Sequence, residues 1–231
     1  MIEITEGFLE GIMDKTIKQL VSLVETSLLT QVTIQSESDY DPVEVTNKTK
    51  EWVLIGKGNY AGVFMHENYP EFVVKVYGRE IYGVKKEAQV YRKLGVHPAY
   101  SQLFHEGKTY LILKRLTGVT LYDAVQRGIK IPEQVIKDVN AALDYATSQG
   151  LNPYDVHGKN VMMKDGRGYV VDISDFYKEG FDKKWTDLVK AYYTFYPFID
   201  KYHIRLPYPL LNVIRKAYRL YRRIKSKRSF R

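Results

Sequence analysis

Apolar residues recur at two different spacings along the chain, and each spacing predicts a different kind of element. From Phe8 to Leu29 they lie three or four residues apart, which predicts an amphipathic helix that packs on something larger. Between Trp52 and Leu116 short apolar runs alternate with glycine, proline and polar residues, as is typical of strands. We expect strands at 32–35, 52–55, 63–65, 72–76 and twice within 101–116, an acidic turn at 36–42, and a helix at 84–94 ended by Gly95.

After Gly118 the pattern becomes helical. It predicts helices at 121–127, 132–149, 183–197 and 207–225, interrupted by a hairpin that ends at Asp172. Strands followed by helices indicate an α+β fold of two lobes, joined near 114–118. We expect a helical extension at 1–49, a small antiparallel sheet lobe with one helix at 50–116, and a compact helical lobe at 117–231. Five aromatic residues of the second lobe are expected in its core: Tyr192, Tyr193, Phe195, Tyr196 and Phe198.

Composition narrows the protein class. The 231 residues are enough for two small lobes with a real core, and they contain no apolar run long enough to span a membrane. The N-terminus is acidic where a signal peptide would be basic, so a cytoplasmic location is the default expectation. The absence of cysteine excludes disulfides and thiolate chemistry, and the five histidines show no zinc-binding spacing.

The net charge of +8 is concentrated at one end of the chain. Residues 215–231 contain nine Lys and Arg and no Asp or Glu, so the remainder is nearly neutral. A basic amphipathic helix of this kind is typical of segments that bind an anionic membrane surface, nucleic acid or an acidic partner. In the alternative interpretation its apolar face packs on the helical lobe and its arginines are only solvated.

The segment 155–172 is the first candidate for chemistry. A loop carries Asp155 and Asn160, and a short hairpin then returns Asp172 beside Asn160. A carboxamide and a carboxylate that converge in this way suit Mg²⁺, which takes oxygen ligands and completes its octahedron with substrate phosphates. Asp155 would then orient or deprotonate a hydroxyl group. An ordinary polar loop and hairpin, with aspartates that cap turns, would contain the same residues.

A glycine-rich turn is the second candidate. Gly56 and Gly58 lie between two predicted strands, where glycine lets the backbone approach a polyphosphate closely. A strand follows the turn rather than a helix, which argues against a Rossmann or P-loop site. We include Ile55, at the entrance to the turn, in this candidate nucleotide site, and we expect Val63 to pack on an adenine ring. Glycine pairs of this kind are also common in hairpins without function.

A lysine within an apolar strand is the third candidate. Buried Lys75 needs an anionic partner, and Glu87 on the following helix is the natural choice. Such a pair can hold the α- and β-phosphates of a nucleotide. The joint between the lobes would offer backbone donors and acceptors to adenine at Lys114 and Leu116. Alternatively, Lys75 is an edge-strand residue that extends to solvent and Glu87 is solvated.

In their order these features resemble the protein-kinase-like superfamily: glycine turn, strand Lys, helix Glu, lobe joint, Asp-x-x-x-x-Asn loop and hairpin Asp. The chain looks like a small bacterial-type serine/threonine protein kinase over roughly residues 50–200. The resemblance implies a two-lobed kinase fold, ATP and Mg²⁺ as cofactors, and transfer of the γ-phosphoryl group to a hydroxyl. By position it makes Lys75 and Glu87 the phosphate-binding ion pair and Gly56 and Gly58 the phosphate-loop glycines, with Ala61 where the third glycine usually stands.

The resemblance also assigns the catalytic and metal residues. It makes Asp155 the catalytic aspartate and Asn160 a metal ligand. Asp172, which follows three strand-forming residues as in RIO and Kdo kinases, is our preferred second metal ligand. Asp175 is the alternative, because Asp175-Phe176 matches the start of the usual Asp-Phe-Gly, although Tyr177 replaces the glycine.

Departures from the family pattern leave the acceptor open. Pro153-Tyr154 stands where the family has His-Arg, and His157 takes the place of a Lys, as in aminoglycoside- and choline-kinase-like enzymes. Lys159 is therefore predicted to supply the missing cation to the transferring phosphoryl group. Little chain is left for an activation segment before the helix at 183. A protein hydroxyl is the preferred acceptor, a small-molecule hydroxyl (sugar, lipid or antibiotic) is the alternative, and a pseudokinase that binds partners without turnover is a third interpretation.

Overall fold

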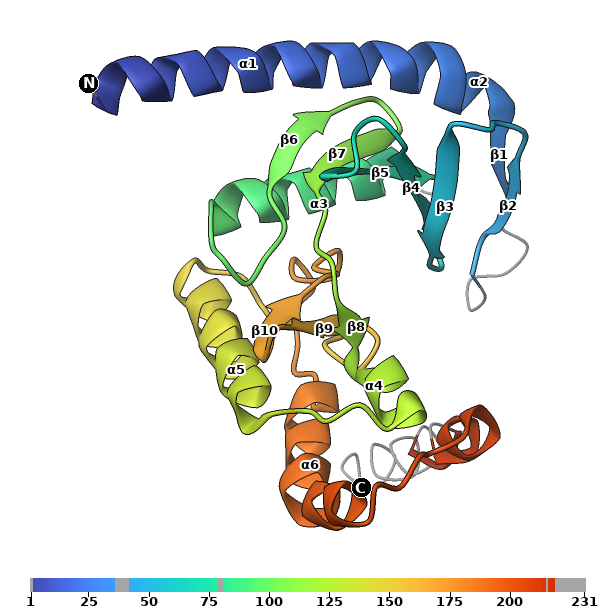
Figure 1. Cartoon of the computed structure of the whole chain (residues 1–231), viewed down its shortest axis with the longest axis vertical. Coiled ribbons are helices and arrows are strands. Elements are labelled where there is room, and N and C mark those ends of the chain that lie inside the picture. Colours follow the sequence, from blue (N-terminus) through green and yellow to red (C-terminus); the bar gives the residue numbers. More distant parts are fainter. Residues whose placement is uncertain (1, 36–41, 79–80, 215, 219–231) are drawn as a thin grey trace.

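The computed structural model describes residues 2–35, 42–78, 81–214 and 216–218, and it confirms the predicted α+β fold of two lobes (Figure 1). The chain begins with one long helical rod that crosses the top of the first lobe. This rod consists of α1 (Ile2–Leu23), a π-helical turn, η1 (Val24–Leu28), and α2 (Leu29–Gln31). A small hairpin follows, made of β1 (Val32–Gln35) and β2 (Glu44–Asn47).

A five-stranded antiparallel sheet forms the first lobe, in the order β3-β4-β5-β7-β6. Helix α3 (Ile81–Leu94) connects the third of these strands in sequence to the fourth. The strands are β3 (Trp52–Lys57), β4 (Ala61–His66), β5 (Phe72–Tyr77), β6 (Leu103–Glu106) and β7 (Tyr110–Lys114).

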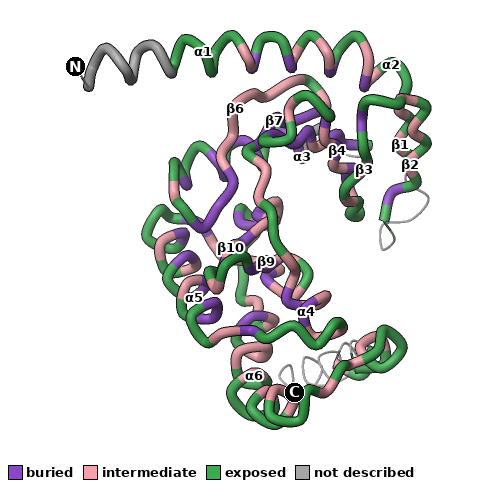
Figure 2. Tube along the Cα trace, in the orientation of Figure 1, coloured by how far each residue is buried: buried purple, intermediate pink, exposed green. Residues whose placement is uncertain are grey.

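Both faces of this sheet are covered, which explains why its central strands are apolar almost throughout. Successive side chains of a strand point to opposite faces. In β5, Phe72, Val74 and Val76 pack on one face with four buried residues of the helical rod, Ile17, Leu20, Val24 and Leu28. On the other face, Val73 and Tyr77 join a core that includes α3 and continues into the second lobe. Figure 2 shows buried positions along the central strands and along the side of α1 that faces the sheet.

The second lobe combines helices with a small sheet. Its helices are α4 (Leu121–Arg127), α5 (Glu133–Ser148) and α6 (Lys184–Lys201). The three-stranded sheet has the order β10-β9-β8, from β8 (Val119–Thr120), β9 (Val161–Lys164) and β10 (Arg167–Val170). Gly118 lies between the lobes with a φ of +152°, and a Cβ there would lie 2.4 Å from the carbonyl oxygen of Met163. The joint therefore passes too close to β9 to accept a larger residue.

The sequence prediction was wrong for part of the second lobe. The helix expected at 183–197 continues through Pro197 to Lys201. Of the five aromatic residues expected in the core, Tyr192 and Tyr196 do pack against it, stacked with ring centroids 4.8 Å apart. Tyr193, Phe195 and Phe198 are exposed instead, because α6 presents only one side to the lobe. Strands β2 and β8 were not predicted, and most of the predicted acidic turn, 36–41, lies outside the described residues.

The C-terminal segment is helical at 208–214 and 216–218. The Tyr218 hydroxyl donates a 2.8 Å hydrogen bond to Asp187 Oδ2 on α6, whereas Leu210 and Ile214 are exposed. Arg215 and the rest of the predicted basic helix lie outside the described residues, so the expected contact with a membrane surface or nucleic acid stays a prediction. Among the helices that the structure describes, none combines the length and the apolar character needed to cross a bilayer.

A buried carboxylate attaches the β9–β10 hairpin to α5. Asp138 accepts hydrogen bonds from Arg167 Nε at 2.7 Å and from the Gly168 N–H at 3.0 Å. The bond from the Arg167 guanidinium is the main cause that lowers the pKa of Asp138 to about 2, while burial acts in the opposite direction. The Asp138 side chain is 10% exposed but that of Arg167 is 64% exposed, so solvent partly screens this ion pair.

Replacement of Asp138 by Asn should therefore lower the free energy of unfolding by about 1 kcal/mol near neutral pH. A carboxylate with a lowered pKa stabilises the fold above its unfolded pKa, and this contribution is lost as the pH falls toward about 2. Urea denaturation between pH 7 and pH 2 should thus show a steeper acid loss for the wild type than for Asp138→Asn. Asp144→Asn, at an exposed position of the same helix, is the control. Parallel pH profiles for wild type and Asp138→Asn would contradict this account.

Candidate active site

A lysine between two carboxylates connects three separate segments of the chain. Lys75 Nζ lies 2.9 and 2.8 Å from the two carboxylate oxygens of Glu87 on α3. It also lies 3.4 Å from Asp172 Oδ1, just after β10 in the second lobe. The strand alternation that sends Val73 and Tyr77 toward α3 sends Lys75 the same way. The side chains of Lys75 and Glu87 are 14% and 1% exposed, so this is a buried ion pair and not a surface lysine.

The electrostatics of the cluster keep the lysine charged. Burial alone would lower the pKa of Lys75, but Asp172 and Glu87 together raise it above its ordinary value. Burial raises the pKa of Glu87, against the opposing effect of Lys75, and the Tyr77 hydroxyl also donates a hydrogen bond to this carboxylate. For Asp172, Lys75 and the Ser174 N–H outweigh the effect of burial and lower the pKa. Asp172 is therefore an anion at neutral pH.

The loop that follows α5 carries the predicted catalytic aspartate in a strained conformation. Asp155 has a φ of +62°, a left-handed value that is uncommon for a residue with a side chain. Its N–H donates a 3.0 Å hydrogen bond to Asp182 Oδ2, and its Oδ1 forms an ion pair with Lys184 Nζ. Its carbonyl oxygen accepts a 3.1 Å bond from Asn160 Nδ2. Contacts on both sides of the residue thus hold a conformation that would otherwise cost about 1 kcal/mol or more.

Asn160 and Asp172 lie on neighbouring segments of the hairpin. The Asn160 carbonyl accepts a 3.0 Å bond from the N–H of Val171, which directly precedes Asp172. Because the Asn160 amide nitrogen is bonded to the Asp155 carbonyl, the amide oxygen is the atom left to bind a cation. Across the described ranges, no three His, Cys, Asp or Glu side chains converge as a metal site. One carboxylate and one amide oxygen fit Mg²⁺, which takes its remaining ligands from phosphates and water.

Asp175, the alternative metal ligand, is engaged elsewhere. Its carboxylate lies 2.8 Å from Lys178 Nζ, and its side chain is 15% exposed. Burial raises the pKa of Asp175 even though Lys178 opposes the shift. Asp175 is thus paired within its own segment, whereas Asp172 lies beside Asn160 and Lys75, and Asp172 stays our preferred metal ligand.

The cation predicted from the catalytic loop, Lys159, lies against an aromatic ring. Lys159 is exposed, and its Nζ lies 4.7 Å from the centroid of the Tyr122 ring. Burial lowers the pKa of His157 below its usual range, although Asp155 opposes this effect. His157 is therefore neutral at pH 7, and its Nε2 lies 3.8 Å from Asp155 Oδ1. The role predicted for Lys159 in phosphoryl transfer stays a prediction.

The glycine-rich turn joins β3 to β4 and points away from α1, toward the second lobe (Figure 1). The Gly58 N–H closes the turn with a 2.9 Å bond to the Ala61 carbonyl. A Cβ added to Gly56 would meet nothing closer than 4.0 Å, and one added to Gly58 would meet nothing within 4 Å. Neither glycine has a positive φ, so the backbone conformation at these two positions does not require glycine. Ile55 is exposed and Val63 is half-buried against the shared core.

The joint offers fewer backbone groups than the sequence suggested. The Lys114 N–H donates a 2.8 Å bond to the Gln102 carbonyl, and the Lys114 carbonyl accepts a 2.6 Å bond from the Ser101 hydroxyl. Both groups of Lys114 are therefore already engaged within the first lobe. Leu116 is half-buried and lies closer to the second lobe in sequence, so it is the better candidate for a hydrogen bond to adenine.

Sequence reasoning missed two residues that hold Asp155. Asp182 is only 4% exposed, and its Oδ1 accepts a 2.9 Å bond from the Lys184 N–H at the start of α6. An aspartate just before an amphipathic helix is a recognisable cap, and this signal was available in the sequence. The second oxygen of Asp182 also reaches Asp155, and Lys184 turns back to the same loop. The sequence does not show these two contacts, because they depend on how α6 packs.

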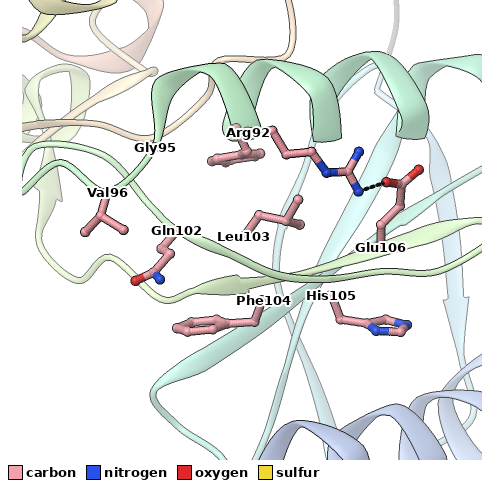
Figure 3. A pocket seen from close by; sticks show the side chains of 9 residues that line it. Arg92, Gly95, Val96, Gln102, Leu103, Phe104, His105 and Glu106 are labelled. Atoms are coloured by element: carbon pink, nitrogen blue, oxygen red, sulfur yellow. Dashed lines mark hydrogen bonds and ion pairs between the residues drawn. The ribbon is translucent and has the colours of Figure 1, made fainter. Parts of the chain in front are cut away.

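The hollow in Figure 3 lies apart from this cluster, between α3 and β6. It has a volume of about 320 Å³ and is crossed by an ion pair between Arg92 and Glu106. None of the predicted site residues lines it. We therefore place the candidate active site between the lobes, around Lys75 and Asp155.

Comparison with known proteins gives one informative match. No model of a known protein family matches the chain. The chain is similar to the putative serine/threonine-protein kinase YrzF of Bacillus subtilis (strain 168), with 32% identity over 168 residues. The matched region covers 71% of this chain and 77% of YrzF.

Replacement of Lys75 by Met should lower the free energy of unfolding by about 3 kcal/mol, because it leaves a buried Glu87 carboxylate without its cation. In the double variant Lys75→Met/Glu87→Gln the neutral amide still accepts the Tyr77 hydrogen bond, so much of this loss should be recovered. Urea denaturation of the wild type, both single variants and the double variant measures the coupling. Strictly additive losses would show that the two side chains do not stabilise each other.

Proposed function

The chain belongs to the kinase-like family that includes the putative serine/threonine-protein kinase YrzF, and from this premise we propose that it is an ATP- and Mg²⁺-dependent phosphotransferase. Its preferred acceptor is a serine or threonine hydroxyl of a protein. The observation that carries this proposal is the contact of Lys75 Nζ with both Glu87 and Asp172. It puts a permanent cation at the junction of the lobes, beside a carboxylate suited to Mg²⁺.

In this proposal the two lobes bind different parts of the nucleotide. The glycine turn, with Gly56 and Gly58, covers the phosphates, and Lys75 contacts the α- and β-phosphates. Val63 and Ile55 line the adenine position, and Leu116 offers the backbone hydrogen bond. Mg²⁺, when bound through the Asn160 amide oxygen and Asp172, neutralises phosphate charge and aligns the γ-phosphoryl group.

Asp155 orients the acceptor hydroxyl in the transfer step. A bond forms between the hydroxyl oxygen and the γ-phosphorus, and the bond from that phosphorus to the β–γ bridging oxygen breaks. The electron pair of the broken bond stays on ADP, and the hydroxyl proton passes to the Asp155 carboxylate. Catalysis then depends mainly on positioning and on charge stabilisation, as is usual for phosphoryl transfer.

A small-molecule hydroxyl is the second candidate acceptor, and one structural observation favours it. Only residues 173–183 separate Asp172 from α6, and this segment is fastened to the lobe. The Asn152 side-chain amide donates bonds of 2.7 and 2.8 Å to the carbonyls of Lys178 and Gly180. Because this segment is short and hydrogen-bonded to the lobe, it offers little surface for binding an extended peptide.

Incubation of the full chain with γ-labelled ATP and Mg²⁺, alone, with generic protein acceptors, and with a set of sugars, lipids and antibiotics, tests the proposal directly. We expect label on protein, and Asp155→Asn should lower kcat by roughly 10³-fold while nucleotide-dependent thermal stabilisation is retained. Asp165→Asn, at an exposed position with a φ of +50°, is the matched control. Label only on sugars, lipids or antibiotics would select the small-molecule acceptor. Thermal stabilisation by Mg·ATP without any product would instead indicate a pseudokinase.

Replacement of Gly58 by Ala should separate the ligand-binding role of the turn from its structural role. An added Cβ would have no neighbouring atom within 4 Å, and the φ of Gly58 is not left-handed. The unfolding midpoint should therefore stay at the wild-type value. The methyl group would hinder close approach of phosphates, and we expect the ATP affinity to fall about tenfold, equivalent to ~1.4 kcal/mol. Thermal shift with increasing ATP measures both quantities. Gly11→Ala, at an open position of α1, is the control, and an unchanged ATP affinity in Gly58→Ala would contradict the assignment.

A further inference from the structure

The catalytic loop lacks a cation of its own beside Asp155. In the loop 155–160, His157 is neutral at pH 7 because burial lowers its pKa. Lys159 carries a charge, but its Nζ lies against the Tyr122 ring, 4.7 Å from the ring centroid. Neither residue therefore supplies a positive charge in contact with the Asp155 carboxylate.

A lysine from another element makes that contact. Lys184 belongs to the first turn of α6, and its Nζ forms an ion pair with Asp155 Oδ1 while lying 3.5 Å from Asp182 Oδ2. Burial would lower the pKa of Lys184, but the bonds to Asp155 and Asp182 raise it, so this ammonium is protonated at neutral pH. Asp155 lies 29 residues before Lys184 in the sequence, and no local sequence pattern connects its loop to α6.

One buried carboxylate holds both members of the pair. Asp182 Oδ2 accepts the Asp155 N–H at 3.0 Å, and Asp182 Oδ1 accepts the Lys184 N–H at 2.9 Å. The backbones of Asp155 and Lys184 are thereby fixed relative to each other independently of the ion pair between their side chains. An ammonium on such a frame loses less conformational freedom on pairing than a lysine on a mobile loop would.

Stability alone gives a weak reason for this pair. The side chains of Asp155 and Lys184 are 33% and 37% exposed, and ion pairs that solvent reaches contribute little to folding. The Asp155 backbone is already held by Asp182 and Asn160. What the lysine adds is control of the carboxylate: its bond to Oδ1 leaves Oδ2 for an acceptor hydroxyl.

We infer that Lys184 is the positioning residue of the transfer reaction, holding Asp155 Oδ1 so that Oδ2 receives the acceptor hydroxyl. This role differs from the one predicted for Lys159, which is to supply a cation to the transferring phosphoryl group. This inference rests on the proposed phosphotransferase function and deepens it. Because Lys184 acts on Asp155 and not on the nucleotide, its removal affects turnover and leaves ATP binding intact.

The test compares the wild type with Lys184→Met, Lys184→Arg and Lys183→Met in the full chain. Lys183 is the exposed neighbour of Lys184, and its Nζ lies near the Phe181 ring. We expect Lys184→Met to lower kcat by roughly 10²-fold with an unchanged KM for ATP. Lys184→Arg should restore most of the rate, and Lys183→Met should match the wild type. Urea denaturation of each variant shows whether the fold is intact.

Two further variants separate action through Asp155 from an independent effect. If Lys184 works through Asp155, then Asp155→Asn/Lys184→Met should be no slower than Asp155→Asn alone. Wild-type kcat in Lys184→Met, equal losses in its Met and Arg variants, or additive losses in the double variant would each overturn the inference. The absence of phosphotransfer by the wild type to any acceptor would overturn the proposed function, and this inference with it.

Discussion

The contact of Lys75 with Glu87 and Asp172 is the constraint on which the arrangement of both lobes depends. A charged lysine inside an apolar sheet is unfavourable unless carboxylates surround it, and here one comes from α3 and one from the second lobe. The position of α3 against the sheet and the position of the hairpin end beneath it are therefore linked. Replacement of a whole buried pair by apolar residues is often neutral for stability, whereas removal of one partner is costly, so Lys75 and Glu87 act as a unit.

The sheet that carries Lys75 is covered on both faces. Apolar residues of the rod formed by α1, η1 and α2 cover one face, and α3 with the second lobe covers the other. The core on the second face runs through both lobes without interruption. Since interiors are closely packed and transmit displacement, the strand with Lys75 and the loop with Asp155 are parts of one packed unit.

A second buried group organises the acceptor side of the site. Asp182 satisfies the N–H of Asp155, whose left-handed backbone is strained, and the N–H that begins α6. Both halves of the candidate active site thus follow the same principle. In each half a buried carboxylate holds its neighbours: Glu87 binds the Lys75 cation, and Asp182 holds the Asp155 backbone. The residue that would contact the substrate is more exposed, Asp172 at 40% and Asp155 at 33%.

The amino-acid sequence alone predicts most of the helices and strands and the two-lobed class, because periodicity reports which positions are buried. A lysine in an apolar strand indicates a buried ion pair, but the sequence leaves open an edge-strand lysine that extends to solvent. Only the packing of the two lobes shows that Lys75 meets Glu87 and Asp172. Lys114 has both backbone groups engaged by residues 101 and 102, Lys159 turns to an aromatic ring, and Lys184 returns to Asp155. Local patterns report only neighbours in sequence, whereas these contacts depend on the packing of α6 and β6 against distant segments. The same packing, which buries one side of α6 only, left three of its aromatic residues in solvent.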